Sequence, residues 1–295
     1  SGSYREAYAA SAQDPNAFWL EAADAIDWIT KPTKALDDRT APVYRWFPDA
    51  ELNTCYNAID RHVLAGRGDQ TAIIYDSAMT GTKKFYTYNE LLEKVSAFAG
   101  ALAKQGISKG DRVLIYMPMI PEAAVAMLAC ARIGAAHSVV FGGFSADALL
   151  SRIQDADAKL VITADGGFRK GAAFALKPAV DEALKGKTNV EKVLVVQRTK
   201  QETAWNSATD IWWHDIVDRQ SAEHVAESFD AEHPLFILYT SGTTAKPKGI
   251  FHTTGGYLTQ ASFTHRAVFD LKPETDVYWC TADVGWITGH SYVVY

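Results

Sequence analysis

A short stretch near residue 240 combines hydroxyl, glycine and lysine residues directly after an apolar run. Residues 238–256 read LYTSGTTAKPKGIFHTTGG. Hydroxyls, cationic side chains and the closely approaching backbone of glycine are the groups with which proteins bind anions. The candidate groups are Thr240, Ser241, Gly242, Thr243, Thr244, Lys246, Lys248 and Gly249. A solvated, Ser/Thr-rich connecting loop has the same composition, so the order of the residues must decide between the two.

That order excludes two common phosphate-binding loops. A P-loop has two glycines five positions apart followed by Lys and Ser/Thr, whereas Gly242 is followed by TTAKPKG. Pro247 also removes a backbone donor from the middle of the stretch. The kinase pattern G-x-G-x-x-G does not fit either. The hypothesis of an anion-binding loop therefore needs a loop of another class.

Three further glycine-containing loops follow apolar runs. FGGFS begins at the end of 136–141, ADGGFRKG at the end of 158–164, and DVGWITGHSY follows 277–282. Ligands of open parallel sheets bind beyond the carboxyl ends of the strands. A glycine after a strand often marks only a turn, but aromatic and cationic residues stand beside these glycines. We therefore expect the four loops to share a ligand cleft.

The elements that must position these loops alternate between strands and helices. Continuous apolar strands separated by helices predict an α/β fold with parallel-rich sheets covered by helices. The predicted strands are 71–76, 84–88, 111–117, 136–141, 158–164, 192–197, 235–240 and 277–282. The predicted helices are 15 to about 29, 88–105, 121–134, one from about 145 and one near 174–185.

We expect three parts along the chain. Residues 1–70 form an N-terminal helix and an irregular wrapping arm, and residues 71–232 form a first α/β lobe that ends in a polar linker from 198. Residues 233–295 begin a second α/β lobe, which carries the anion-binding stretch. A chain of 295 residues is long enough for about two domains or lobes.

Composition excludes several classes of function. The chain has 29 Lys and Arg against 35 Asp and Glu and no basic run, which argues against a nucleic-acid partner. Its 3 cysteines and 8 histidines are dispersed, so we expect no metal site built from them. No signal peptide and no apolar run of roughly 20 residues is seen, so we expect a cytoplasmic protein without a membrane partner. The oligomeric state stays open.

Several long motifs together resemble one enzyme superfamily. YTSGTTAKPKG (239–249) is similar to YTSGTTGKPKG, the nucleotide-binding signature of the adenylate-forming enzymes. IYMPMIPEAAVAMLACARIGAAHSVVFGGFSADAL and VYWCTADVGWITGHSYVVY resemble the short-chain acyl-CoA synthetases of that superfamily, above all those for acetate and propionate. The resemblance covers nearly the whole chain. It implies the large N-terminal domain of an adenylate-forming enzyme.

The resemblance also implies a two-step ligation. ATP and a short-chain carboxylate form an acyl-adenylate and release pyrophosphate, and the thiol of CoA then displaces AMP. Hydroxyls, backbone amides and lysines of the phosphate loop, together with Mg²⁺, would stabilise the charge on the departing pyrophosphate. The implied small-molecule partners are ATP, Mg²⁺, CoA and either acetate or propionate.

Residue roles follow from the matched motifs. The phosphate loop would consist of the eight candidate residues named above, with Thr243 and Lys248 as its catalytic members. The acyl pocket would be formed by Trp286, Ile287, Thr288, Gly289 and His290. CoA would be contacted by Phe141, Gly142 and Gly143 at its adenine and by Arg169 at its 3′-phosphate. The plainer alternatives are core packing for Trp286 and His290, turns for the glycines, and a surface ion pair for Arg169.

Three departures from the family pattern limit these expectations. Ala245 stands where the family usually has glycine, and a Cβ at a position that needs positive φ costs about 1 kcal/mol or more, which would weaken ATP binding. Ala172 stands where a second arginine is frequent, and Lys170 supplies only a point charge for CoA. The chain stops at Tyr295, so the resemblance places the adenine contacts, a magnesium carboxylate and a mobile C-terminal domain with a catalytic lysine beyond it. We expect little activity without that domain.

Two alternatives to an active ligase remain. Ala245 and the expected absence of the C-terminal domain suggest a catalytically silent nucleotide- or CoA-binding module, and a much longer natural chain would indicate the ligase region of a multifunctional protein. The substrate is also open. HTTGGYLT (252–259) and Thr288 favour acetate, whereas WFPDAELNTCYNAIDRHV (46–63) favours propionate.

Overall fold

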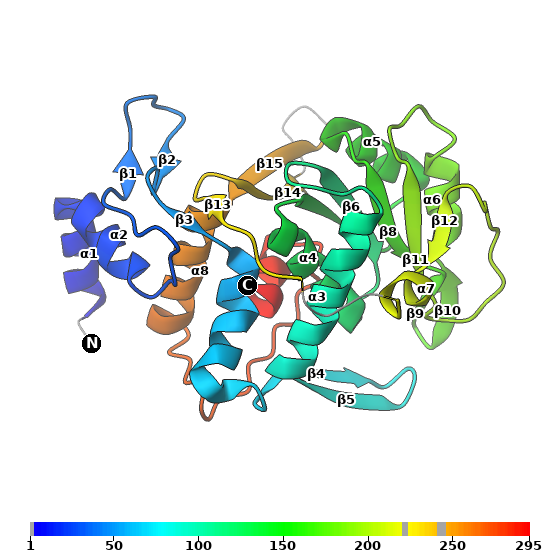
Figure 1. Ribbon diagram of the computed structural model, residues 1–295, viewed down its shortest axis with the longest axis horizontal. Coiled ribbons are helices and arrows are strands. Elements are labelled where there is room, and N and C mark those ends of the chain that lie inside the picture. The colour runs from blue at the N-terminus through cyan, green and yellow to red at the C-terminus, as the bar shows by residue number, and fades with distance from the viewer. Residues whose placement is uncertain (1–2, 220–223, 241–245) are drawn as a thin grey trace.

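Seven strands form the central sheet of the computed structural model, which describes residues 3–219, 224–240 and 246–295 (Figure 1). The strand order is β12-β11-β8-β6-β7-β14-β15. All neighbours are parallel except β14 and β15, which form an antiparallel hairpin. The bounds are β6 (Arg112–Met117), β7 (Ala136–Phe141), β8 (Leu160–Ala164), β11 (Lys192–Val196), β12 (Asp210–Trp212), β14 (Pro234–Thr240) and β15 (Lys248–Thr253). The predicted α/β fold with a parallel-rich sheet is confirmed.

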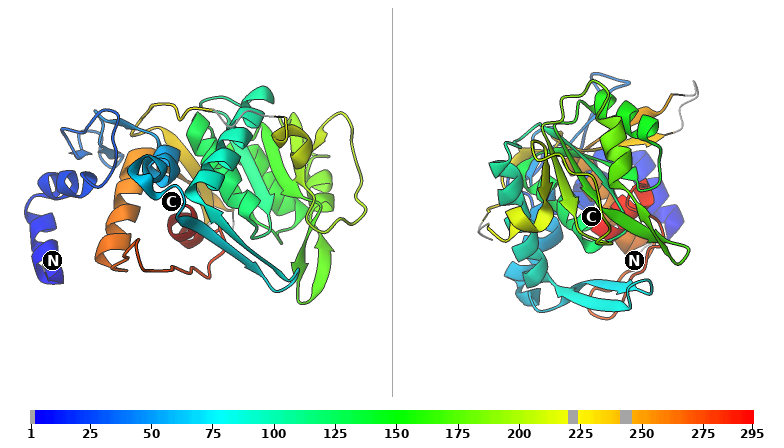
Figure 2. Two further views of the ribbon diagram at one scale, coloured as in Figure 1. Left: turned by 60° about the horizontal axis from the view of Figure 1, so that its bottom comes forward. Right: turned by 90° about the vertical axis from the view of Figure 1, so that its right-hand side faces the viewer.

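Helices cover both faces of this sheet. On one face α3 packs against α4 and α7, and on the opposite face α5 packs against α6. This division follows from the strand order, because right-handed crossovers that lead in opposite directions along a sheet place their helices on opposite faces. Figure 2 shows the sheet enclosed between these layers. The bounds are α3 (Tyr88–Lys104), α4 (Pro121–Ile133), α5 (Ala146–Ala156), α6 (Lys177–Ala183), α7 (Trp213–Val217), α8 (Thr254–Ala267), α9 (Ile287–Gly289) and η3 (His290–Val294).

The N-terminal arm has its own small core beside the main one. Ala23, Ile26, Phe47 and Leu52 are buried there together with Leu258 of α8. The arm lies at one end of the molecule in Figure 2. Its elements are α1 (Tyr4–Gln13), α2 (Pro15–Ala23), β1 (Leu36–Asp37), β2 (Arg45–Trp46), β3 (Glu51–Leu52), η1 (Tyr56–Asp60) and η2 (Val63–Arg67). Strand β3 pairs with β13 (Phe229–Asp230), which ties the arm to a distant part of the chain.

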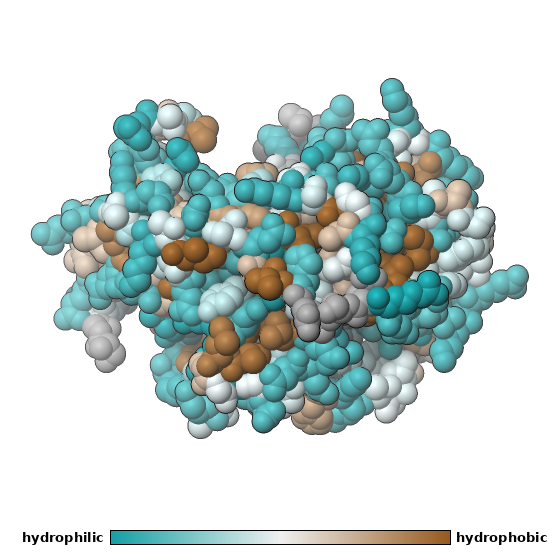
Figure 3. Space-filling model, viewed as in Figure 1, coloured by the Kyte–Doolittle hydropathy of each residue, from teal (hydrophilic) through white to brown (hydrophobic). Residues whose placement is uncertain are grey.

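Two hairpins follow the arm and lie outside the central sheet. The hairpin of β4 (Thr71–Ser77) and β5 (Thr82–Thr87) was expected, whereas that of β9 (Gly166–Arg169) and β10 (Ala172–Ala175) was expected to be a loop. The face in Figure 3 is mostly hydrophilic, with apolar side chains gathered over the η1–η2 segment, where Leu64 is 73% exposed. Within the described ranges, none of the helices has the length and apolar character needed to cross a membrane.

Local sequence signals explain where several helices begin and end. Thr87 and Glu90 form a capping box at the start of α3, because each side chain binds the backbone N–H of the other. Pro121 opens α4, and Gly134 ends it in a left-handed conformation with φ of 73°. A side chain at Gly134 would also lie 2.6 Å from the ring of Phe229.

The expected strand at 277–282 is wrong. These residues have no strand partner in the described parts of the chain, and Val277 and Trp279 are 77% and 83% exposed. An apolar run becomes a strand only where a neighbouring strand pairs with its backbone groups. Period and composition indicate the tendency of such a run, but they do not supply the neighbour.

Three other expectations were also wrong. Helix α2 ends at Ala23 rather than near residue 29. The Ala23 carbonyl at its end accepts a hydrogen bond of 2.8 Å from the Trp28 indole. The expected polar linker from 198 contains β12, which pairs with β11, and α7, in which Trp213 stacks on Phe98 of α3 with ring centroids 3.7 Å apart. The irregular arm contains the helical segments η1 and η2.

The division into residues 1–70, 71–232 and 233–295 stays a proposal. Phe236 of β14 lies opposite His137 of β7 in one parallel ladder, so residues on both sides of position 233 share a sheet.

Candidate functional site

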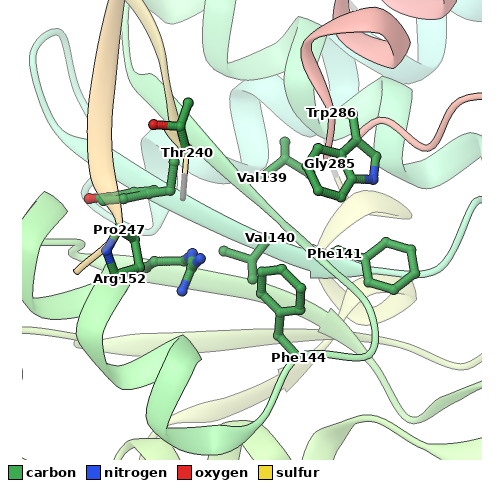
Figure 4. Close-up of a pocket in the computed structure, with 10 residues that line it drawn as sticks. Val139, Val140, Phe141, Phe144, Arg152, Thr240, Pro247, Gly285 and Trp286 are labelled. Atoms are coloured by element: carbon green, nitrogen blue, oxygen red, sulfur yellow. The ribbon is translucent and has the colours of Figure 1, made fainter. Parts of the chain in front are cut away.

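The carboxyl ends of β7 and β14 open into a pocket of about 320 Å³. Figure 4 shows its lining residues converging from the β7–α5 loop, helix α5, the β14–β15 hairpin and the segment before α9. Small-molecule sites are concave and mostly apolar, with a few polar groups that orient the ligand. The lining residues are Val139, Val140, Phe141, Phe144, Arg152, Tyr239, Thr240, Pro247, Gly285 and Trp286. The pocket thus joins residues from three of the predicted loops, those at Phe141, Thr240 and Trp286.

The loop at Phe141 is held close to two other loops. A side chain at Gly142 would lie 2.9 Å from the Met117 carbonyl oxygen at the end of β6, so this position has little space for one. A Cβ at Gly143 would lie 3.8 Å from Nη1 of Arg169. The fold therefore brings the four candidate CoA residues Phe141, Gly142, Gly143 and Arg169 together, although Arg169 lies 26 positions beyond Gly143.

The candidate phosphate loop lies between the two strands of a hairpin. Thr240 ends β14 directly opposite Lys248, which begins β15, and Tyr239 lies opposite Gly249. Thr240, Lys246, Lys248 and Gly249 are exposed. Ser241, Gly242, Thr243, Thr244 and Ala245 lie outside the described residues. The hairpin register therefore places Thr240 and Lys248 of the candidate loop at paired positions on neighbouring strands.

The candidate acyl residues divide into two groups. Trp286 lines the pocket, and Ile287 and Thr288 are exposed beside it. Gly289 and His290 are buried, and His290 packs against the ring of Phe236 with centroids 4.6 Å apart. Only Trp286 of these five residues therefore lines the pocket.

Sequence reasoning missed Arg152, which lines the pocket from α5. Its guanidinium lies over the rings of Phe144 and Tyr239, with centroid distances of 4.8 and 5.3 Å. Burial lowers the pKa of Arg152. A signal was present in the sequence, because Arg152 falls on the face of α5 where the helical period predicts apolar residues, next to Leu149, Ile153 and Ala156.

Asp165 was also missed, and it organises the hairpin that carries Arg169. Its carboxylate is fully buried and accepts hydrogen bonds of 2.7 to 2.9 Å from the backbone N–H groups of Gly166, Arg198, Thr199 and Lys200. Its own carbonyl accepts a 3.0 Å bond from the Gln201 amide. One side chain thus joins the end of β8 to the loop after β11.

Comparison with known proteins decides the family. Residues 60–295 match the model of the AMP-binding enzymes, and residues 4–58 match that of the acetyl-coenzyme A synthetase N-terminus. The chain belongs to the AMP-binding enzyme family. The resemblance to adenylate-forming acyl-CoA synthetases is thereby confirmed, and two family models together cover almost all of the described chain.

Curated relatives support the same family. The acetyl-coenzyme A synthetases of Streptomyces avermitilis and Streptomyces coelicolor are 64% and 63% identical to this chain over 290 residues. The enzyme of that name from Yersinia pseudotuberculosis is 54% identical over 298 residues. These matches cover 98% to 99% of this chain but only 44% to 45% of the relatives, so the chain spans less than half of their length.

No cluster of three or more His, Cys, Asp or Glu side chains that could hold a metal ion exists among the described residues of this AMP-binding enzyme. Mg²⁺ is commonly bound through one or two carboxylates together with the phosphates of a substrate.

Two buried histidines, His137 and His290, make stability depend on pH. Burial lowers the pKa of His290 to about 3, and burial together with His290 lowers the pKa of His137 well below its ordinary value. The Nε2 of His290 and the Nδ1 of His137 have no hydrogen-bond partner among the described residues. Both rings are therefore neutral in the folded protein, whereas they accept protons below about pH 6.5 in the unfolded chain.

We expect the free energy of unfolding to fall on acidification from pH 7 to pH 4.5. A folded-state pKa below the unfolded value gives stability that is present above pH 6.5 and lost as pH falls toward the folded pKa. The slope from each histidine reaches about 1.4 kcal/mol per pH unit. Urea unfolding of the parent and His290→Gln at several pH values measures it. An identical pH dependence in the two proteins would contradict this contribution of His290.

Proposed function

We propose that this protein activates a short-chain carboxylate with ATP and transfers the acyl group to CoA, releasing pyrophosphate and AMP. The pocket carries the proposal, because residues of the candidate CoA, phosphate and acyl loops line it together. The names of the acetyl-coenzyme A synthetases to which the chain is similar support the same reaction. A cytoplasmic location and small molecules as the main partners belong to this proposal.

In the first step, a carboxylate oxygen attacks the α-phosphorus of ATP, and the bond to the β-phosphate breaks. The negative charge that leaves with pyrophosphate is stabilised by the hydroxyl of Thr240, the ammonium groups of Lys246 and Lys248, and the rest of the phosphate loop (241–245, with Thr243 as a catalytic residue). Mg²⁺ bound to ATP would supply further positive charge. No step is assigned to a metal site of the protein.

In the second step, the thiol sulfur of CoA attacks the acyl carbon and AMP leaves with the bonding electron pair. Phe141, Gly142, Gly143 and Arg169 would bind the nucleotide part of CoA. Trp286 would close the end of the acyl site and restrict it to two or three carbons, with Ile287, Thr288, Gly289 and His290 forming the segment behind it. Acetate is preferred over propionate in this proposal, since the relatives are named for acetate.

We expect carboxylate-dependent exchange of pyrophosphate into ATP without CoA, with acetate above propionate and butyrate lowest. The chain is measured beside a version extended by the C-terminal half of the Streptomyces avermitilis relative, because the present chain spans 44% of that protein. Lys248→Met in the extended protein should lower the exchange rate about 100-fold, since it removes a charge from the transition state. Exchange in neither protein, despite ATP binding, would contradict the ligase function and favour a silent binding module. In that case, binding of ATP or CoA would indicate a folded binding module, whereas a lack of binding would indicate that the protein has not folded.

A further inference from the structure

Arg152 differs from the other buried cations of the protein. It is only 8% exposed, and no carboxylate oxygen of the described residues lies within 4.0 Å of its guanidinium. Lys177, by contrast, lies 2.7 Å from both Asp181 and Asp210, and Arg132 lies 2.8 Å from Asp60. A buried charge without a counter-charge destabilises a protein unless other interactions compensate. Within the part of the chain that the structure describes, Arg152 therefore has no carboxylate counter-charge.

The residues around Arg152 do not supply that partner. Its Nη1 donates a 2.7 Å hydrogen bond to the carbonyl of Ala148, one turn back in α5. The nearby carboxylate of Asp155 instead accepts a 2.7 Å hydrogen bond from the Tyr239 hydroxyl. Burial and Asp155 raise the pKa of Tyr239, so this tyrosine stays neutral at physiological pH. The guanidinium has five N–H donors, and the bond to Ala148 uses one of them.

The same side chain extends into the pocket. Figure 4 shows the Arg152 guanidinium pointing inward among Val140, Phe144 and the wall that carries Thr240 and Pro247. The remaining lining residues are apolar apart from Tyr239 and Thr240. The five residues that follow Thr240 in the sequence, Ser241 to Ala245, include no carboxylate. Among the described lining residues, an anion that enters this pocket would therefore face the guanidinium of Arg152 beside Thr240 and Pro247.

We propose that Arg152 binds a phosphate oxygen of the ligand that occupies this pocket. The inference rests on the proposed function and adds a binding residue to it. The triphosphate of ATP and the phosphates of CoA share this chemistry. A planar guanidinium fixed between two rings is preorganised for a charge-assisted hydrogen bond to such an oxygen. The bound anion would then supply the counter-charge that the Arg152 guanidinium lacks among the described residues of the free protein.

Calorimetric titration of the full chain with inorganic pyrophosphate, ATP and CoA tests this inference. The variants are Arg152→Met, Arg152→Lys and, as a matched control, Arg45→Met, which changes an exposed arginine of β2. We expect Arg152→Met to weaken binding of the recognised ligand about 10- to 100-fold, the range for a lost charged hydrogen bond. Arg152→Lys should recover part of the affinity, and Arg45→Met should bind like the parent. A loss for pyrophosphate and ATP assigns the triphosphate, and a loss for CoA alone assigns CoA.

Unfolding without ligand separates binding from a structural role. If Arg152 serves a ligand, Arg152→Met should unfold at the same or a higher urea concentration than the parent, because the unpaired buried charge is gone. Pyrophosphate or CoA should then stabilise the parent more than the variant. Equal affinities of parent and Arg152→Met, or an Arg152→Lys protein that binds no better than Arg152→Met, would overturn the inference and leave the proposed function standing. A parent chain that binds none of the three anions would overturn both, and a large loss of stability without ligand would assign Arg152 to the core.

Discussion

Gly289→Ala is expected to lower the rate of carboxylate-dependent pyrophosphate exchange about 100-fold and the free energy of unfolding by about 3 kcal/mol. A Cβ at position 289 would lie 2.1 Å from the Asp283 carbonyl oxygen and 2.7 Å from the Val284 nitrogen. Both are backbone atoms, so no side-chain rotation relieves the clash. The 283–289 segment must shift, and displacing a substrate-positioning group by about 1 Å can cost 100-fold in rate.

Gly81→Ala is the matched control, because its Cβ would meet nothing within 4 Å. Gly81 lies in the β4–β5 turn with φ of 63°. Alanine there should lower the free energy of unfolding by only about 1–2 kcal/mol, the cost of a left-handed residue, and leave the exchange rate unchanged. Urea unfolding and exchange rates of both variants, measured in the extended protein, give the comparison. If Gly289→Ala kept both parental stability and parental exchange, the close packing of this segment on Asp283 would be refuted.

Asp165→Ala should lower the free energy of unfolding by about 4 kcal/mol, the largest stability effect that we expect from a single polar side chain here. The buried carboxylate binds four backbone N–H groups, and its removal leaves those donors without a partner. Asp165→Asn keeps one acceptor oxygen and should cost about half as much. The β9–β10 hairpin would also loosen, so the affinity for CoA should fall through displacement of Arg169.

Denaturant unfolding of Asp165→Ala, Asp165→Asn and the exposed control Asp38→Ala measures this effect. The control should stay within about 0.5 kcal/mol of the parent, as is usual for surface substitutions. An Asp165→Ala protein as stable as the parent would show that water or other groups satisfy the four N–H donors equally well.

Sequence alone predicted most of the central architecture. The strands at 111–117, 136–141, 158–164 and 192–197 and the helices at 88–105 and 121–134 are confirmed with small shifts of their ends. These elements carry strong local signals: apolar runs for buried strands, a capping box before α3, and Pro121 and Gly134 around α4. The long motifs likewise placed the chain in its family, because their residues are contiguous and their order is specific.

Only the tertiary structure decided which residues meet. The run 277–282 has the composition of a strand but no strand partner among the described residues. Trp213 of α7 stacks on Phe98, which lies 115 positions earlier in the chain. The residue patterns assigned no role to Arg152 or Asp165, because Arg152 matters through the lack of a counter-charge among the described residues and Asp165 through four converging N–H groups. Local signals reside in adjacent residues and are readable in sequence, whereas burial, pairing and desolvation depend on contacts between residues far apart in the chain. The sequence therefore determined the family, the strand–helix order and the candidate loops, and the fold decided which of their side chains face one pocket.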